Sequence, residues 1–84
     1  MKYLDSDLIR KEVERTDGRF FAVQFIKLSG KSRYLRGRTR RADQYRQTKF
    51  TIPVFDIEIN AVRNLPTDRV FYLAANRLKH RASL

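Results

Sequence analysis

The lysines and arginines of this sequence are the residues whose type and spacing most clearly suggest a function, the binding of a polyanion. The formal net charge of the 84-residue chain is +10. Residues 27–49 hold nine basic residues against Asp43 alone, whereas residues 1–26 hold five of each sign. Lysine and arginine clustered in this way contact successive phosphates and release their counterions. We therefore expect residues 27–49 to contact DNA or RNA or, alternatively, an acidic surface of a protein.

Two tyrosines, Tyr34 and Tyr45, lie among these cations, and tyrosine rings stack on unpaired bases. The alternative for Tyr34 is a half-buried position in a strand, and the alternative for the whole segment is a solvated charged surface. The near absence of acidic residues between positions 27 and 49 favours binding. The predicted contact residues are Lys31, Arg33, Tyr34, Arg36, Arg38, Arg40, Arg41, Tyr45, Arg46 and Lys49.

A second pattern is the pair of carboxylates at Asp56 and Glu58, which share one side of a predicted strand. Paired carboxylates hold Mg²⁺ in nucleases, with a cation such as Lys49 or Arg63 nearby. The interpretation that we favour is charge balance with arginines on a neighbouring strand, with Arg63 as the partner across the following turn. No third acidic ligand lies close in sequence, so we predict no metal and no cofactor.

The single histidine, His80, lies in a basic C-terminal segment. Nearby cations favour the neutral form of a histidine, which is the form that acts as a general base. The interpretation that we favour is an exposed histidine in a mobile basic tail over residues 79–84. The sequence has no cysteine nucleophile and no glycine-rich phosphate loop, so we predict that the protein is not an enzyme.

The elements that must position these residues are mostly strands. Alternating apolar residues predict a strand over residues 19–27, and Gly30 suits a tight turn into a second strand over residues 32–38. Two more strands are predicted over residues 49–59 and 62–65. The pattern is typical of a mainly β domain built from hairpins.

Three segments need separate interpretation. Residues 1–16 predict a short helix with a cap at Asp5 or Ser6 and a narrow apolar stripe. Residues 70–78 fit a helical stripe and a buried strand, and we favour the strand because strands dominate upstream. Pro53 cannot donate to a ladder and marks an edge, a strand start or a bulge.

Length and composition predict one domain without a membrane segment. No apolar stretch approaches the roughly 18 residues of a membrane span, and the N-terminus lacks the apolar core of a signal peptide. The chain has no cysteine, as is common in reducing compartments. We therefore expect a cytoplasmic protein with no membrane partner.

Residues 19–75 resemble small SH3-like barrel proteins of phages and bacteria. In those proteins an aromatic-rich strand leads into a Lys-x-x-Gly turn and an arginine, here Lys27, Gly30 and Arg33. A Val-Phe-Asp strand and a Leu-x-x-Asp-Arg-Val connection follow, here from Val54 and from Leu65. The resemblance implies a five-stranded, partly open antiparallel barrel.

The expected organisation combines this resemblance with the predicted helix and basic tail, although the helix and the arginine-rich loop of residues 39–48 depart from the barrel pattern. The resemblance also gives a second hypothesis on function. The short helix of residues 1–16 would cover an end or edge of a barrel over residues 19–78, with a basic tail over residues 79–84. Phage accessory proteins of this size often bind and block a host protein. The second hypothesis is therefore a phage-encoded inhibitor that docks its basic surface on a host protein.

A weaker likeness is to the ribonuclease toxins of bacterial toxin–antitoxin pairs. Those proteins are also small and basic, and they carry arginine, tyrosine and a C-terminal His-Arg segment near the RNA. Tyr45-Arg46 and His80-Arg81 are similar to this pattern. The long helical hairpin that usually precedes the toxin sheet is missing from residues 1–16. A ribonuclease is thus the third hypothesis.

Overall fold

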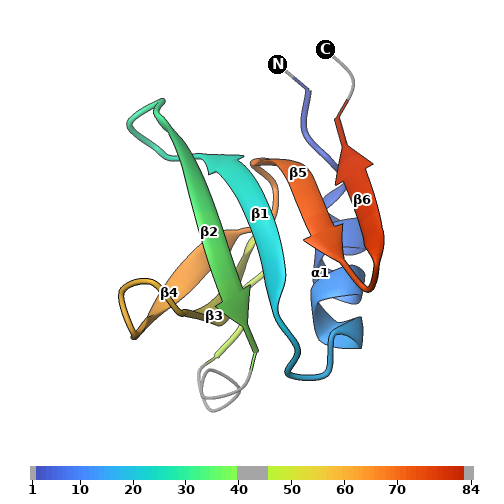
Figure 1. Cartoon of the computed structure of the whole chain (residues 1–84). Coiled ribbons are helices and arrows are strands. Elements are labelled where there is room, and N and C mark those ends of the chain that lie inside the picture. Colours follow the sequence, from blue (N-terminus) through green and yellow to red (C-terminus); the bar gives the residue numbers. More distant parts are fainter. Residues whose placement is uncertain (1, 40–45, 83–84) are drawn as a thin grey trace.

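The computed structural model describes residues 2–39 and 46–82 of the chain. Within these residues a single helix precedes six strands, and all strand pairs are antiparallel (Figure 1). The elements are α1 (Ser6–Arg15), β1 (Phe21–Ile26), β2 (Ser32–Arg38), β3 (Thr51–Asp56), β4 (Ala61–Pro66), β5 (Val70–Ala75) and β6 (Leu78–Arg81). The predictions of a mainly β domain and of a short N-terminal helix are confirmed.

The six strands form one sheet in the order β4-β3-β2-β1-β5-β6. Strands β4 and β6 are its edges and are not hydrogen-bonded to each other, so the sheet is not closed over the residues that the structure describes. The predicted barrel had five strands, whereas the described chain has a sixth, β6, in the segment expected to be a mobile tail. The structure differs from the predicted barrel in these two respects.

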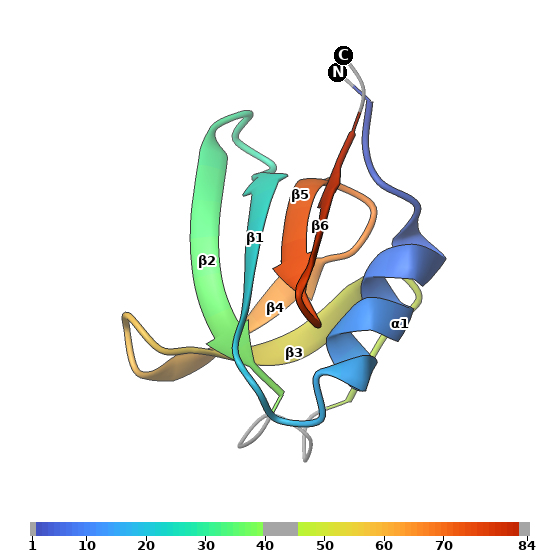
Figure 2. The ribbon, with the colours of Figure 1, turned by 45° about the vertical axis from the view of Figure 1, so that its right-hand side comes forward.

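Helix α1 begins where the sequence predicts it. The side chain of Asp5 caps the helix by accepting a hydrogen bond from the Leu8 backbone N–H at 3.2 Å. Ile9 and Val13 are fully buried, so the narrow apolar stripe of the helix faces the core. In Figure 2 the helix lies beside β5 and β6, on the side of the molecule away from β2. The helix therefore covers one side of the sheet and leaves the other side open.

The core lies between α1 and the concave side of the sheet. Alternate residues of β1 are buried, which puts Phe21, Val23 and Phe25 on the inner side. Leu35 of β2 and Leu73 of β5 are buried on the same side as their partner Val23. We call this buried side of β1, β2, β5 and β6 the inner side and the opposite side the outer face.

The β5–β6 hairpin is the main feature that sequence reasoning missed. Asn76 and Arg77 connect the strands with φ values of 54° and 66°. Two consecutive residues with positive φ are typical of a type I′ turn, which usually carries glycine at its second position. Arg77 occupies that position here, so the turn lacks the usual Asn-Gly signal although Asn76 is present. The favoured strand for residues 70–78 is confirmed only over Val70–Ala75.

Strands β2 and β3 pair over a short distance. Only Gly37 and Arg38 of β2 face Asp56 and Phe55 of β3 among the described residues. A side chain at Gly37 would meet Leu35 Cδ2 at 2.9 Å and the Phe55 carbonyl oxygen at 3.0 Å, so glycine permits the close approach. Pro53 lies on the part of β3 that pairs with β4 alone, which confirms the prediction of an edge position.

Candidate nucleic-acid interface

Three of the predicted contact residues share the outer face of β2. Leu35 and Gly37 are buried, so the side chains of Tyr34, Arg36 and Arg38 lie on the opposite side of the strand. The side chain of Tyr34 is 46% exposed. Figure 1 views the sheet from this side, with α1 behind it. This part of the predicted site is therefore on an open surface.

Strand register extends the surface around Tyr34 across the sheet. Tyr34 faces Gln24 of β1, which in turn faces Tyr72 of β5, and Tyr72 faces Arg81 of β6. Directly opposed residues point to the same side of a sheet, so these four side chains form one row on the outer face. The two tyrosines are two strands apart, a spacing of about 10 Å. Both rings therefore belong to one surface.

A second row runs parallel to the first. Arg36 of β2 faces Ala22 of β1, Ala22 faces Ala74 of β5, and Ala74 faces Lys79 of β6. The two alanines leave the space between the cations free of large side chains. A polyanion that lies across β1 and β5 along this row would meet a cation at each end, Arg36 on β2 and Lys79 on β6.

Ring contacts fix two of the arginines on the outer face. The guanidinium of Arg38 lies over the ring of Phe20, 5.6 Å from its centroid, and Phe20 is 55% exposed. The guanidinium of Arg81 lies over the ring of Tyr72 at 4.9 Å. Such cation–π contacts hold the long side chains against aromatic rings. Arg81 is exposed, whereas Arg38 is half-buried and its Nε has no hydrogen-bond partner among the described residues. No described acidic residue belongs to this face.

The other predicted contact residues are not on the outer face. Arg33 lies on the inner side, where its Nη2 is 3.4 Å from Oδ2 of Asp56. Lys31 is exposed in the β1–β2 turn. Lys49 lies beside the helix, because its carbonyl oxygen accepts a hydrogen bond from Arg10 at 2.7 Å.

Four predicted contact residues, all between positions 40 and 46, remain. Arg46 is exposed, and no hydrogen bond or ion pair of its side chain is observed within the described residues. Arg40, Arg41 and Tyr45 lie outside the residues that the structure describes. The candidate interface therefore consists of residues of β2 together with residues of β1, β5 and β6.

Several residues of the outer face were not predicted as contacts. Phe20, Tyr72, Lys79 and Arg81 come from β1, β5 and β6 or their flanks. The sequence does contain a signal for the last two, since Lys79 and Arg81 are two positions apart and share one side of a strand. That signal was missed because residues 79–84 were interpreted as a tail.

The carboxylate of Asp56 is a structural ion-pair partner. The side chain is buried, and its Oδ2 lies 3.4 Å from Arg33 Nη2 and 3.7 Å from Arg63 Nη1. The favoured interpretation, charge balance with arginines such as Arg63, is confirmed for Asp56. Glu58 lies in the turn after β3 and is not part of an ion pair among the described residues, so the predicted pair on one strand face is wrong. Within residues 2–39 and 46–82, no group of three or more acidic or histidine side chains could hold a metal ion.

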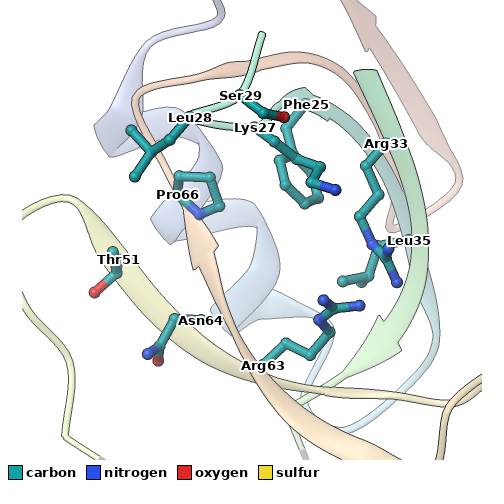
Figure 3. Close-up of a pocket in the computed structure, with 10 residues that line it drawn as sticks. All are labelled: Phe25, Lys27, Leu28, Ser29, Arg33, Leu35, Thr51, Arg63, Asn64 and Pro66. Carbon is teal, nitrogen blue, oxygen red and sulfur yellow. The ribbon is translucent and has the colours of Figure 1, made fainter. Parts of the chain in front are cut away.

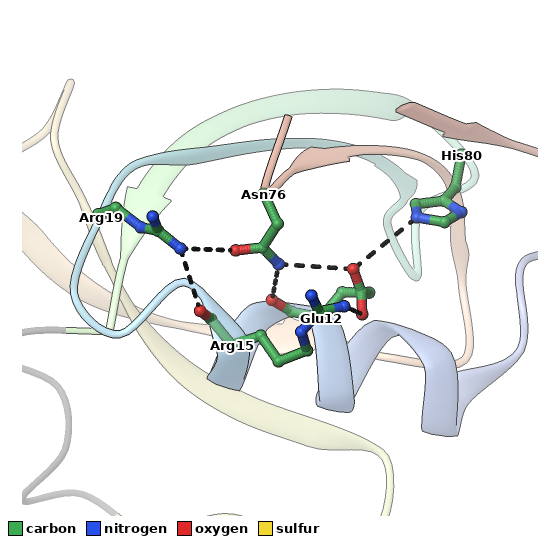
Figure 4. A network of polar contacts seen from close by, with 5 residues as sticks. All are labelled: Glu12, Arg15, Arg19, Asn76 and His80. Carbon is green, nitrogen blue, oxygen red and sulfur yellow. Dashed lines mark hydrogen bonds and ion pairs between the residues drawn. The ribbon is translucent and has the colours of Figure 1, made fainter. Parts of the chain in front are cut away.

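His80 lies in a polar network on the inner side, which corrects the prediction of an exposed tail histidine (Figure 4). Its Nε2 is 4.0 Å from Oε1 of Glu12, a helix residue that is only 4% exposed. Asn76 donates to the Glu12 carbonyl oxygen at 2.9 Å, and Arg15 Nη1 donates to Glu12 Oε2 at 2.8 Å. The hydrogen bond from Arg15 is the main cause of a lowered Glu12 pKa, against the opposing effect of burial. The network ties α1 to the β5–β6 hairpin.

Comparison of the chain with protein-family models, with characterised proteins and with solved structures finds no significant match. Among the described residues no helix is long and apolar enough to span a membrane. The features that bear on function are therefore the geometry and charge of the outer face.

Proposed function

We propose that the protein binds single-stranded nucleic acid on its outer face, with little sequence preference and without catalysis. One observation carries this proposal. The same side of β2, β1, β5 and β6 presents two tyrosines and four cations, and none of its described residues is acidic. The cations are Arg36, Arg38, Lys79 and Arg81.

Each kind of side chain has a defined role in this proposal. Unpaired bases stack on the open ring of Tyr34 and on the Arg81 guanidinium that lies over the Tyr72 ring. Every base accepts such a contact because each has an aromatic face. The cations neutralise phosphates and contribute no sequence preference of their own. Gln24 lies between the two tyrosines and can donate to a base edge or a phosphate.

Salt dependence tests the electrostatic part of the proposal. Four phosphate contacts on a single strand, at about −0.7 each, predict a slope of roughly −3 for log K against log salt. The measurement is fluorescence anisotropy of a labelled oligothymidylate, with the duplex of the same length as comparison. An affinity that does not change between low and physiological salt would contradict the proposal.

Charge variants test whether the outer face is the site. We expect the double variant Arg36→Ala, Lys79→Ala to weaken oligonucleotide binding and to lower the salt slope by about 1.4. The matched control is Lys2→Ala, Lys11→Ala, which removes two exposed cations outside the outer face. If both double variants weakened oligonucleotide binding equally, affinity would depend on total charge alone. That result would contradict the assignment of the outer face as the binding site.

The hypotheses of a host-protein inhibitor and of a ribonuclease predict other outcomes. An inhibitor would retain one stoichiometric partner in a pull-down after nuclease treatment, with no oligonucleotide binding. A ribonuclease would cleave RNA, and the cleavage would be lost on alanine substitution of His80 or Arg46. Salt-dependent binding without cleavage supports the proposal made here over both.

We also propose that the chain is a variant of the SH3-like barrels that its sequence resembles. What supports this is the strand order, in which β1 to β4 form a meander and β5 returns beside β1. Strand β6 is then an addition to that arrangement. It is the addition that supplies Lys79 and Arg81 to the outer face.

A further inference from the structure

A pocket of about 450 Å³ opens between the β1–β2 hairpin and β4, on the inner side of β2 (Figure 3). It exists because β2 pairs with β3 only at Gly37 and Arg38, among the described residues, so the first half of β2 has no strand beside it there. Phe25, Leu35 and Pro66 line it with apolar surface. Its volume falls in the range of about 300–1,000 Å³ that is usual for small-molecule sites.

Three cations line the same pocket. They are Lys27, Arg33 and Arg63, and in Figure 3 the two arginine side chains extend toward each other from opposite walls. Both arginines also approach Oδ2 of the buried Asp56, at 3.4 Å and 3.7 Å, although Asp56 itself does not line the pocket. One shared carboxylate leaves the group of three cations with an excess of positive charge.

The hydrogen-bonding capacity of these arginines is also incompletely used. Arg33 Nε is buried and has no hydrogen-bond partner within the described structure. A buried donor without a partner is unfavourable, and a shift of the Arg33 side chain toward an anion in the pocket can relieve it. Arginine forks match the oxygens of a phosphate or a carboxylate better than those of other ligands.

We propose that this pocket binds a small organic anion with a planar apolar body. Arg63, Arg33 and Lys27 hold its phosphate or carboxylate, and the body lies against Phe25 and Pro66. The apolar floor excludes strongly hydrated inorganic anions as the preferred ligand, because these would leave the floor uncovered. The site lies on the opposite side of β2 from the outer face and does not depend on the proposed function.

The experiment is a titration of the ¹⁵N-labelled protein, followed by amide chemical shifts. The probes are adenosine 5′-monophosphate, 2-naphthoate, inorganic phosphate and neutral adenosine. We expect saturable shifts at residues 27–33 and 63–65 for at least one of the two organic anions. Its affinity should exceed that of phosphate and of adenosine by at least about tenfold, the effect of one charge-assisted hydrogen bond.

The same titration distinguishes a phosphorylated ligand from a carboxylate ligand. Tighter binding of the nucleotide identifies a phosphorylated ligand, and tighter binding of naphthoate identifies a carboxylate ligand. Binding of inorganic phosphate as tight as that of both organic anions would overturn the proposal, because the apolar floor would then contribute nothing. Absence of saturable shifts at the pocket with all four probes would overturn it as well.

Two variants test whether the cations of the pocket cause the amide chemical-shift changes. Lys27→Ala removes an exposed side chain, and Arg63→Gln leaves Arg33 to pair with Asp56, so both proteins should fold. We expect each variant to weaken binding of the organic anion by about tenfold or more. The control Lys79→Ala should leave anion binding unchanged.

The same variants keep this proposal separate from the proposed function. Lys27→Ala should retain oligonucleotide binding to within about twofold, whereas Arg36→Ala with Lys79→Ala should retain anion binding. Loss of oligonucleotide binding alone therefore concerns the outer face. Unchanged anion binding in both Lys27→Ala and Arg63→Gln would contradict the pocket assignment.

Discussion

Tyr34 is the residue that makes the outer face more than a charged surface. Its ring is 46% exposed on an otherwise regular strand, and its strand neighbours Arg33 and Leu35 point to the inner side. An exposed aromatic ring has little role in the core, so its removal should spare stability. A stacked base, by contrast, would lose its partner.

We expect Tyr34→Ala to weaken single-stranded oligonucleotide binding by about tenfold or more, because stacking contributes about 1–3 kcal/mol per base. The expected change in unfolding free energy is below about 1 kcal/mol. Tyr3→Ala is the matched control, since Tyr3 is 39% exposed near the N-terminus. Anisotropy and thermal unfolding measure the two effects. Equal oligonucleotide affinities of the Tyr34→Ala and Tyr3→Ala variants would contradict stacking of a base on Tyr34.

Glu12 gives a prediction on pH. Its pKa is lowered from the ordinary value of 4.5, chiefly by the Arg15 hydrogen bond. A carboxylate whose folded pKa is lowered stabilises the protein above its unfolded pKa, and this contribution is lost as the pH falls through the folded pKa. Glu12→Gln should therefore lower the melting temperature at pH 7, and the difference from the wild type should shrink at pH 3.

The control for Glu12 is Glu14→Gln, an exposed position on the same helix. Its melting temperature should follow that of the wild type at pH 7. A Glu12→Gln difference that grew on acidification would mean that the network with Arg15 and Asn76 does not stabilise the charged carboxylate.

At the scale of elements, the β5–β6 hairpin supplies half of the cations of the outer face. Its turn keeps Arg77 at a φ of 66°, in the left-handed region that costs a residue with a side chain roughly 1 kcal/mol. Asn76, by contrast, is held by hydrogen bonds to Glu12 and Arg19. The two turn residues should therefore respond differently to glycine.

We expect Arg77→Gly to raise the free energy of unfolding by up to about 1 kcal/mol, and Asn76→Gly to lower it by about 1–2 kcal/mol. The gain at position 77 comes from relieved strain, and the loss at position 76 comes from the missing amide. Urea unfolding measures both. A stabilised Asn76→Gly would show that the contacts of the amide contribute nothing.

The junction of β2 and β3 gives a second prediction at this scale. Gly37→Ala would put Cβ 2.9 Å from Leu35 Cδ2 and 3.0 Å from a backbone oxygen, so something must shift. We expect a loss of about 1–3 kcal/mol in unfolding free energy, as for overpacking. Gly30→Ala meets no atom within 4 Å and should cost only about 1 kcal/mol, for its φ of +90°. Urea unfolding should rank the two variants in this order, and the reverse would contradict the close approach.

Most of the elements could be predicted from the sequence, because their signals are local. Alternation around Phe21, Val23 and Phe25 defined β1, and Asp5 defined the start of the helix. The sixth strand and the open sheet could not be predicted in this way. The β5–β6 turn carries arginine where glycine is usual, and nothing local specifies whether edge strands meet.

The candidate site could be predicted only in part, for the same reason. Clustering along the chain identified Arg36 and Arg38, but strand alternation separates Arg33 from them. Register, which depends on distant residues, adds Tyr72 and Arg81 from the end of the chain. Clustering of charge along the sequence therefore identifies part of the basic surface, but it does not determine which residues share that surface.

At the scale of the whole molecule, charge is unevenly distributed between its two sides. Five of the nine acidic residues lie within residues 1–26, in or near α1, behind the sheet as Figure 1 views it. The outer face carries cations and none of the acidic residues that the structure describes. Such asymmetry orients a polyanion before contact and speeds its association with the basic side. The fold therefore places four cations on one side of the sheet, where no described residue is acidic.

The central claim is that the outer face is where single-stranded nucleic acid binds. The most direct test is a titration of the ¹⁵N-labelled protein with a short oligothymidylate, read at each backbone amide. We expect the largest shifts at Gln24, Tyr34, Arg36, Tyr72 and Lys79, with α1 unchanged. Shifts confined to α1 and residues 46–50, or no saturable shift at low salt, would contradict it.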